Sequence, residues 1–166
     1  MSPPVGRALI AGLAVLVAGL AAAAVWAGTS RNAAQADERD RRAAVQAATV
    51  HAAALLALDH RTVDQDVKRL IDTSTGQARD GYVKARAALR QATLEREVSQ
   101  TGVLRAAGLV SMAGEGRTAE VLVVGDALIR WEADDKHRPE ERLYRWRMEV
   151  TKAGGRWLVS RSELVQ

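Results

Sequence analysis

The chain has 166 residues with a formal net charge of +4, from 24 basic and 20 acidic side chains, and it contains neither cysteine nor phenylalanine. The lack of cysteine excludes a disulfide framework, a thiolate zinc site and a thiol nucleophile. The charges are mixed along the chain and form no concentrated basic patch, which argues against nucleic acid as a partner.

Residues 8–27 form an uncharged apolar stretch, ALIAGLAVLVAGLAAAAVWA, behind a short tail of residues 1–7. Twenty helical residues at about 1.5 Å each span roughly 30 Å, the thickness of the hydrocarbon core of a bilayer. We predict a single-pass transmembrane helix in the cell membrane. A cleaved signal peptide ending near Ala27 is the alternative. We expect the C-terminal domain outside the cytoplasm because long domains translocate largely regardless of charge, although the Lys and Arg count of the two flanks does not favour this orientation.

Residues 31–58 contain no glycine or proline and predict one long helix. Residues 28–44, which are charged on all sides, are expected to stand in water as a stalk. An apolar stripe then begins at Val45 and is expected to dock the helix on a domain formed by residues 45–166.

Two shorter helices are predicted next. The first begins after Thr62, whose side chain is expected to cap it, and ends at the turn of residues 73–76. The other covers residues 77–98, with Tyr82 and Val83 on two neighbouring apolar faces, and Gly81 weakens its start.

From Ser99 onward, β-branched and aromatic residues alternate with polar ones, which predicts four strands near residues 102–112, 118–132, 142–151 and 156–165. Tyr144 and Trp146 begin the clearest apolar face. Gly114 and Gly116 lack the strand-to-helix context of a phosphate loop and indicate a hairpin turn. The fold class is α+β, with the helices packed on a curved four-stranded antiparallel sheet that forms a cone.

Three short segments follow the apolar stretch in a fixed order. They are Leu58-Asp59-His60-Arg61-Thr62-Val63-Asp64-Gln65-Asp66, Thr75-Gly76 and Gly155-Arg156-Trp157-Leu158-Val159-Ser160. With them the whole chain resembles the Mce-associated membrane proteins of actinobacteria, which accompany the mammalian-cell-entry lipid importers. One departure is Gln77-Ala78, where members of that family usually have an aromatic residue.

The resemblance implies the cone fold of nuclear-transport-factor and cystatin-like domains, which is also found in the periplasmic part of a type IV secretion scaffold protein. It further implies a non-enzymatic accessory role in the assembly or stability of a lipid import complex. The partners would be importer components or homologous accessory proteins. It carries over no catalytic residue and no cofactor. A secretion-scaffold-like subunit that oligomerises through its domain is an alternative.

The same cone also hosts enzymes, such as ketosteroid isomerases, in which a buried carboxylate abstracts a proton. The enzymatic alternative places Asp59 or Asp126 in a pocket with Tyr82 as the donor; the other polar candidates are His51, His60, Asp64 and Asp66. No pair has the local signature of a nucleophile and its base, so capping and packing roles are favoured.

A metal site is not expected either. His51 and His60 are nine residues apart and cannot share one helical turn, and His137 lies in a charged loop beside Asp134 and Asp135.

Aromatic and arginine side chains supply the remaining candidates. The aromatic residues fill the core or line a pocket for a small hydrophobic ligand, and the core is favoured; they are Tyr82, Trp131, Tyr144, Trp146 and Trp157. The arginines form either a face for a partner or anionic headgroups, or the wet side of a strand; they are Arg138, Arg142, Arg145 and Arg147.

Overall fold

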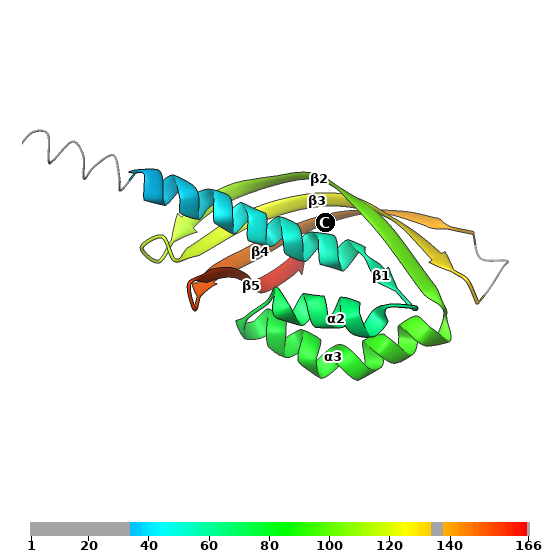
Figure 1. The fold of residues 1–166 in the computed structure, drawn as a ribbon. Coiled ribbons are helices and arrows are strands. Elements are labelled where there is room, and N and C mark those ends of the chain that lie inside the picture. The colour runs from blue at the N-terminus through cyan, green and yellow to red at the C-terminus, as the bar shows by residue number, and fades with distance from the viewer. Residues whose placement is uncertain (1–33, 134–137, 166) are drawn as a thin grey trace, which may run out of the picture. The chain divides into compact units, whose positions relative to one another are not determined.

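The computed structural model describes residues 34–133 and 138–165. The chain divides into two compact units, residues 1–39 and 40–166, and the second unit contains the fold described below (Figure 1). The predicted tail, transmembrane helix and start of the stalk lie outside the described residues, as does His137. Within the described residues, no helix combines the length and the apolar character needed to cross a bilayer.

The N-terminal helix is described over residues 34–56. Its buried face carries small side chains, Ala44, Ala48 and Ala52, and ends in Leu56. Because alanines have little bulk, this helix lies close to the sheet. The compact unit begins at Asp40, inside the segment that we predicted as a stalk.

The sheet has five strands, whereas four were predicted. The additional strand directly follows the N-terminal helix. Strand β1 (Leu58–Asp59) pairs antiparallel with Ser99 and Gln100, and the N–H of His60 donates to the carbonyl of Val98 at 2.8 Å. Two residues are too few for an alternating pattern. This strand therefore exists only because its partner strand passes beside it, and the sequence could not show it.

Helix α2 (Val63–Asp72) buries Val63, Val67 and Leu70. Thr62 stands at its N-cap position, but the predicted cap is wrong because the Thr62 side chain bonds to no helix N–H. Its hydroxyl donates instead to the carboxylate of Asp66 at 2.8 Å.

Helix α3 (Gly76–Glu95) runs through Gly81 without a break. Its two predicted apolar faces are mostly exposed: Thr93 is its buried residue, Tyr82 is half-buried, and Val83 is 53% exposed. Alanine favours helix whether or not it is buried. The alanine-rich pattern therefore predicted the helix correctly and its burial wrongly.

The four longer strands form an antiparallel meander, and the order in the sheet is β1-β2-β3-β4-β5. They are β2 (Val98–Ala113), β3 (Thr118–Trp131), β4 (Glu140–Ala153) and β5 (Arg156–Leu164). All four were predicted, with β2 starting four residues earlier than expected. The sheet arches over the helices, and its inner face holds Val121, Val123, Met148 and Val159, all fully buried (Figure 1). The α+β class with helices on one side of a curved sheet is confirmed.

Two glycines let the N-terminal helix approach the sheet closely. A Cβ atom at Gly125 would lie 2.8 Å from Cδ1 of Leu56, and one at Gly102 would lie 2.8 Å from Cβ of Leu56. Real Cβ atoms do not approach so closely, so both strands need glycine here. Leu56 therefore fills the space between the helix and the sheet at this point.

Candidate functional site

The three residues of the enzymatic alternative do not come together. Tyr82 extends from α3 towards the N-terminal helix, where it meets His51. Asp126 pairs with Val103 and Leu143 on the outer face of the sheet. Asp59 lies in β1 and bonds to Ser99. Asp126 and Tyr82 lie on opposite sides of the sheet and cannot act on one substrate, and the hydrogen bonds of Asp59 are to residues other than Tyr82.

A buried hydrogen-bond chain joins three helical elements through His51. Its Nδ1 lies 2.8 Å from the Thr73 hydroxyl oxygen, and its Nε2 lies 3.0 Å from the Tyr82 hydroxyl. The Thr73 hydroxyl itself donates to the carbonyl of Arg69 at 2.8 Å, so its oxygen accepts from His51. Nδ1 therefore carries the proton and Nε2 accepts from Tyr82. Both ring nitrogens are used within the protein.

Burial keeps this imidazole neutral. His51 is fully buried, and desolvation lowers its pKa from 6.5 to about 4. Desolvation likewise raises the pKa of the Tyr82 hydroxyl. Both shifts favour the uncharged forms that the hydrogen-bond chain requires. The arrangement therefore suits a structural joint between the N-terminal helix, the end of α2 and α3.

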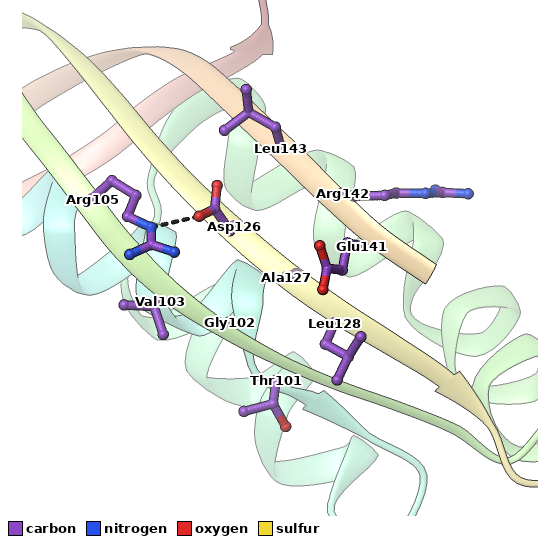
Figure 2. Close-up of a pocket in the computed structure, with 10 residues that line it drawn as sticks. All are labelled: Thr101, Gly102, Val103, Arg105, Asp126, Ala127, Leu128, Glu141, Arg142 and Leu143. Atoms are coloured by element: carbon purple, nitrogen blue, oxygen red, sulfur yellow. Dashed lines mark hydrogen bonds and ion pairs between the residues drawn. The ribbon is translucent and has the colours of Figure 1, made fainter. Parts of the chain in front are cut away.

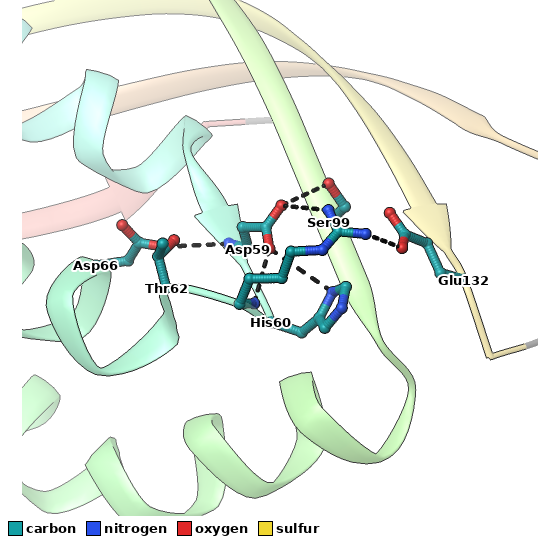
Figure 3. A network of polar contacts seen from close by, with 7 residues as sticks. Asp59, His60, Thr62, Asp66, Ser99 and Glu132 are labelled. Atoms are coloured by element: carbon teal, nitrogen blue, oxygen red, sulfur yellow. Dashed lines mark hydrogen bonds and ion pairs between the residues drawn. The ribbon is translucent and has the colours of Figure 1, made fainter.

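A second polar network surrounds Asp59 at the other end of α2 (Figure 3). The Asp59 carboxylate accepts from the backbone N–H of Arg61 at 2.7 Å and from the hydroxyl of Ser99 at 2.9 Å. The Arg61 guanidinium bonds to Glu132, beyond the end of β3. The Arg61 N–H bond is the main reason that the pKa of Asp59 lies below its usual value. The network fastens the turn after β1 to the ends of β2 and β3.

The other polar candidates also have structural surroundings. Asp66 is buried and accepts from the backbone N–H of Asp59 at 3.2 Å, and Asp64 forms an ion pair with Arg90 at 3.1 Å. His60 places Nδ1 3.7 Å from the Asp59 carboxylate, beyond hydrogen-bond distance. Among the described residues, no three acidic or histidine side chains gather closely enough to hold a metal ion.

The tryptophans fall in different parts of the fold. Trp146 is 6% exposed and stacks on Tyr144 with ring centroids 5.1 Å apart, and Trp157 is 9% exposed. Trp131 is half-buried at the far end of β3, opposite Val98. The Trp157 indole N–H donates to Asp40 at 3.3 Å. Trp146 and Trp157 are core residues, whereas Trp131 lies apart at the end of β3.

Sequence reasoning missed the contacts of Asp40. Lys152 donates to its two carboxylate oxygens at 2.7 and 2.9 Å, and these hydrogen bonds are the main reason that its pKa lies below the usual value. The two residues are 112 positions apart, so no local pattern relates them.

The four predicted arginines do not share one face. Arg145 and Arg147 pair with Val124 and Leu122 on the outer face of the sheet, while Arg142 lies opposite Ala127, on the inner side. Arg138 is exposed ahead of β4. Arg147 forms an ion pair with Glu120 at 3.2 Å, and Arg142 forms one with Glu140.

A depression on the outer face lies over β2, β3 and β4 (Figure 2). Its volume is about 520 Å³, and its lining combines apolar side chains with four charged ones, Arg105, Asp126, Glu141 and Arg142. Val103 and Leu143 are 58% and 56% exposed, and Arg105 bonds to Asp126 between them. Exposed aliphatic side chains beside charges of both signs suit a protein surface better than a charged small molecule.

Residues 6–166 match the family described as "Uncharacterized protein Rv1363c/MT1408-like". The chain belongs to this family. A relative from Mycobacterium tuberculosis (strain ATCC 25618 / H37Rv), "Uncharacterized protein Rv1363c", is 32% identical over 133 residues, which cover 79% of this chain and 49% of the relative. The chain thus spans about half the length of that relative.

Solved structures show where else this family's fold occurs. The periplasmic domain of DotI matches with a TM-score of 0.60 and 13% identity, over 73% of this chain and 91% of that chain. An IcmL-like type IV secretion system protein from Legionella pneumophila matches with a TM-score of 0.57 and 12% identity, over 74% of this chain and 91% of that chain. At such identities the similarity shows the fold alone.

Proposed function

We propose that this member of the Rv1363c/MT1408-like family is a non-enzymatic, membrane-anchored accessory subunit of a multiprotein complex in the cell envelope. The observation that carries the proposal is the contrast between the two sides of the sheet. On the inner side, Leu56 fills the space against Gly102 and Gly125. On the outer side, Val103 and Leu143 stay more than half exposed around a depression. The surface available for binding is therefore the outer face of the sheet, which suits contact with a partner protein.

The polar groups support the same proposal. A general base needs a free lone pair within reach of its substrate. His51 uses both ring nitrogens in hydrogen bonds to Thr73 and Tyr82, and Asp59 accepts from Arg61 and Ser99. His51 and Asp59 therefore make contacts that hold the fold together, which supports a non-enzymatic role.

The complex that we favour is a lipid importer of the mammalian-cell-entry type. This choice rests on the resemblance of residues 58–66, 75–76 and 155–160 to Mce-associated proteins, and the mycobacterial relative agrees with an actinobacterial source. In this proposal residues 8–27 hold the domain at the outer face of the cell membrane.

A co-purification experiment tests the proposal. The full chain is tagged, expressed in its native membrane and recovered in mild detergent, and the associated proteins are identified by mass spectrometry. We expect importer components with the wild type and at least a tenfold lower yield with Leu143→Glu, which places a charge in the outer depression. Val83→Glu on α3 is the matched control, because Val83 is exposed to a similar extent at 53%. Recovery of no envelope protein with the wild type contradicts the proposal.

A secretion-type scaffold is the second candidate, because the matching folds include the periplasmic domain of DotI and an IcmL-like type IV secretion system protein. The same co-purification separates the two candidates. Secretion components in place of importer components would select the scaffold, again with a loss of yield in Leu143→Glu.

A further inference from the structure

The sheet has an open edge along strand β2, from Thr101 to Ala113. Strand β1 covers β2 only at Ser99 and Gln100. Beyond these residues, the side of β2 that faces away from β3 meets no other strand within residues 40–133 and 138–165 (Figure 1). An uncovered strand edge presents unpaired backbone N–H and C=O groups to any further strand.

The opposite edge of the sheet, along β5, is partly covered by another segment of the chain. The segment after α2 lies against β5, where the N–H of Thr75 donates to the carbonyl of Val159 at 2.8 Å. The N–H of Val159 donates in turn to the carbonyl of Thr73 at 3.1 Å. This edge is covered along its middle by the chain itself, so β2 is where another strand has room to pair.

The side chains of β2 do not protect the edge. Monomeric sheets block such edges with lysine, proline or inward charges. Between Thr101 and Ala113 the sole charged residue is Arg105, and its guanidinium bonds to Asp126 on the neighbouring strand. Val103 and Val110 are 58% and 51% exposed.

Two register shifts interrupt β2, and they leave a regular segment between them. The shifts lie at Leu104/Ala106 and Leu109/Ser111. Bulges of this kind bend a strand locally and deter pairing where they occur. From Ala106 to Leu109 the pairing with β3 is continuous, and the central side chains are small.

We infer that β2 pairs with β2 of a second copy, antiparallel about a twofold axis at Ala107. A twofold interface must be self-complementary. This register sets Ala106 opposite Gly108 of the second copy, both on the outer face of the sheet. It sets Arg105 opposite Leu109, so the two arginines do not oppose each other. The two sheets join into one that continues through the dimer.

A cysteine at the axis tests the register. Residues directly opposite in an antiparallel pair have Cα atoms about 4.5–5.5 Å apart, within the Cα separations that a disulfide can bridge. The chain contains no cysteine, so Ala107→Cys introduces a single thiol. In the full chain in mild detergent, we expect Ala107→Cys to form a covalent dimer under oxidation at least tenfold faster than Ala88→Cys, an exposed position on α3. Equal rates at the two positions overturn the inference.

A charge on the edge gives an independent test. The protein mass in detergent is measured by light scattering for the full chain, Val110→Lys and Val83→Lys, two valines of matched exposure at 51% and 53%. We expect a dimer for the wild type and Val83→Lys, and at least a tenfold weaker dimer for Val110→Lys. A monomeric wild type overturns the inference. A dimer that Val110→Lys leaves intact also overturns it, because such a dimer is held elsewhere, for example by the N-terminal apolar segment.

Discussion

The Nε2 atom of His51 lies 3.0 Å from the Tyr82 hydroxyl and so joins the N-terminal helix to α3. The joint matters because α3 is otherwise largely exposed, with Thr93 as its buried residue. A helix with so little buried surface depends on specific contacts for its position.

Replacing Tyr82 with phenylalanine tests this joint. The Tyr82→Phe variant leaves Nε2 of the buried His51 without its donor, so we expect a loss of about 1–3 kcal/mol in the free energy of unfolding. Urea unfolding followed by tryptophan fluorescence measures the loss. Val83→Ala, the exposed neighbour, should change stability by less than about 0.5 kcal/mol. Equal effects of the two variants would show that the hydrogen bond is unimportant.

The pH dependence of stability should report the buried imidazole. Because the pKa of His51 is lowered from 6.5 to about 4 in the folded protein, the unfolded chain takes up the proton more readily. The contribution of His51 is therefore complete above about pH 6.5 and is lost as the pH falls towards 4, by up to about 3 kcal/mol.

Urea unfolding at pH values from 4.5 to 7.5 checks this prediction, with His51→Gln as the reference because its side chain does not titrate. We expect the wild type to lose more stability than His51→Gln across this interval. Parallel curves for the two proteins would mean that His51 does not carry the effect.

The close approach of Leu56 to the sheet predicts a steric clash. In Gly125→Ala the new Cβ would lie 2.8 Å from Cδ1 of Leu56 and 3.1 Å from the carbonyl oxygen of Val103. Overpacking of this kind costs about 1–3 kcal/mol. The control is Gly81→Ala on the exposed side of α3, where nothing lies within 4 Å of the added methyl group.

A double mutant identifies the atom responsible. Adding Leu56→Ala removes the side chain that the new methyl group meets, so Gly125→Ala should be less damaging in that background than in the wild type. Thermal unfolding of the four proteins gives the coupling. If the stability losses of the two substitutions simply add, the new methyl group clashes with the Val103 carbonyl and not with Leu56.

Trp157 provides a test of core packing. It is 9% exposed, and its indole N–H donates to Asp40. We expect Trp157→Ala to cost about 3–5 kcal/mol in the free energy of unfolding. Trp157→Phe keeps much of the buried area and loses the hydrogen bond, so it should cost clearly less, as measured by urea unfolding. If Trp157→Ala leaves the free energy of unfolding unchanged, this indole is not part of the core.

The sequence by itself determined the class of the fold and the elements with strong periodic patterns. The alternation through Tyr144 and Trp146 depends on the two-residue repeat of a strand, and the apolar stripe that begins at Val45 depends on the helical repeat. Both patterns are local, so they are visible without tertiary contacts. They predicted four of the five strands, the three helical segments and the core position of Trp146.

Only the tertiary structure decided which polar residues meet. Asp40 and Lys152 are 112 positions apart, His51 and Tyr82 are 31 apart, and β1 forms because β2 passes beside it. The tertiary structure also decided that α3 is mostly exposed to solvent and that the predicted arginines lie on different faces of the sheet. These outcomes depend on which faces become neighbours after folding, and the spacing of residues along the chain does not encode that.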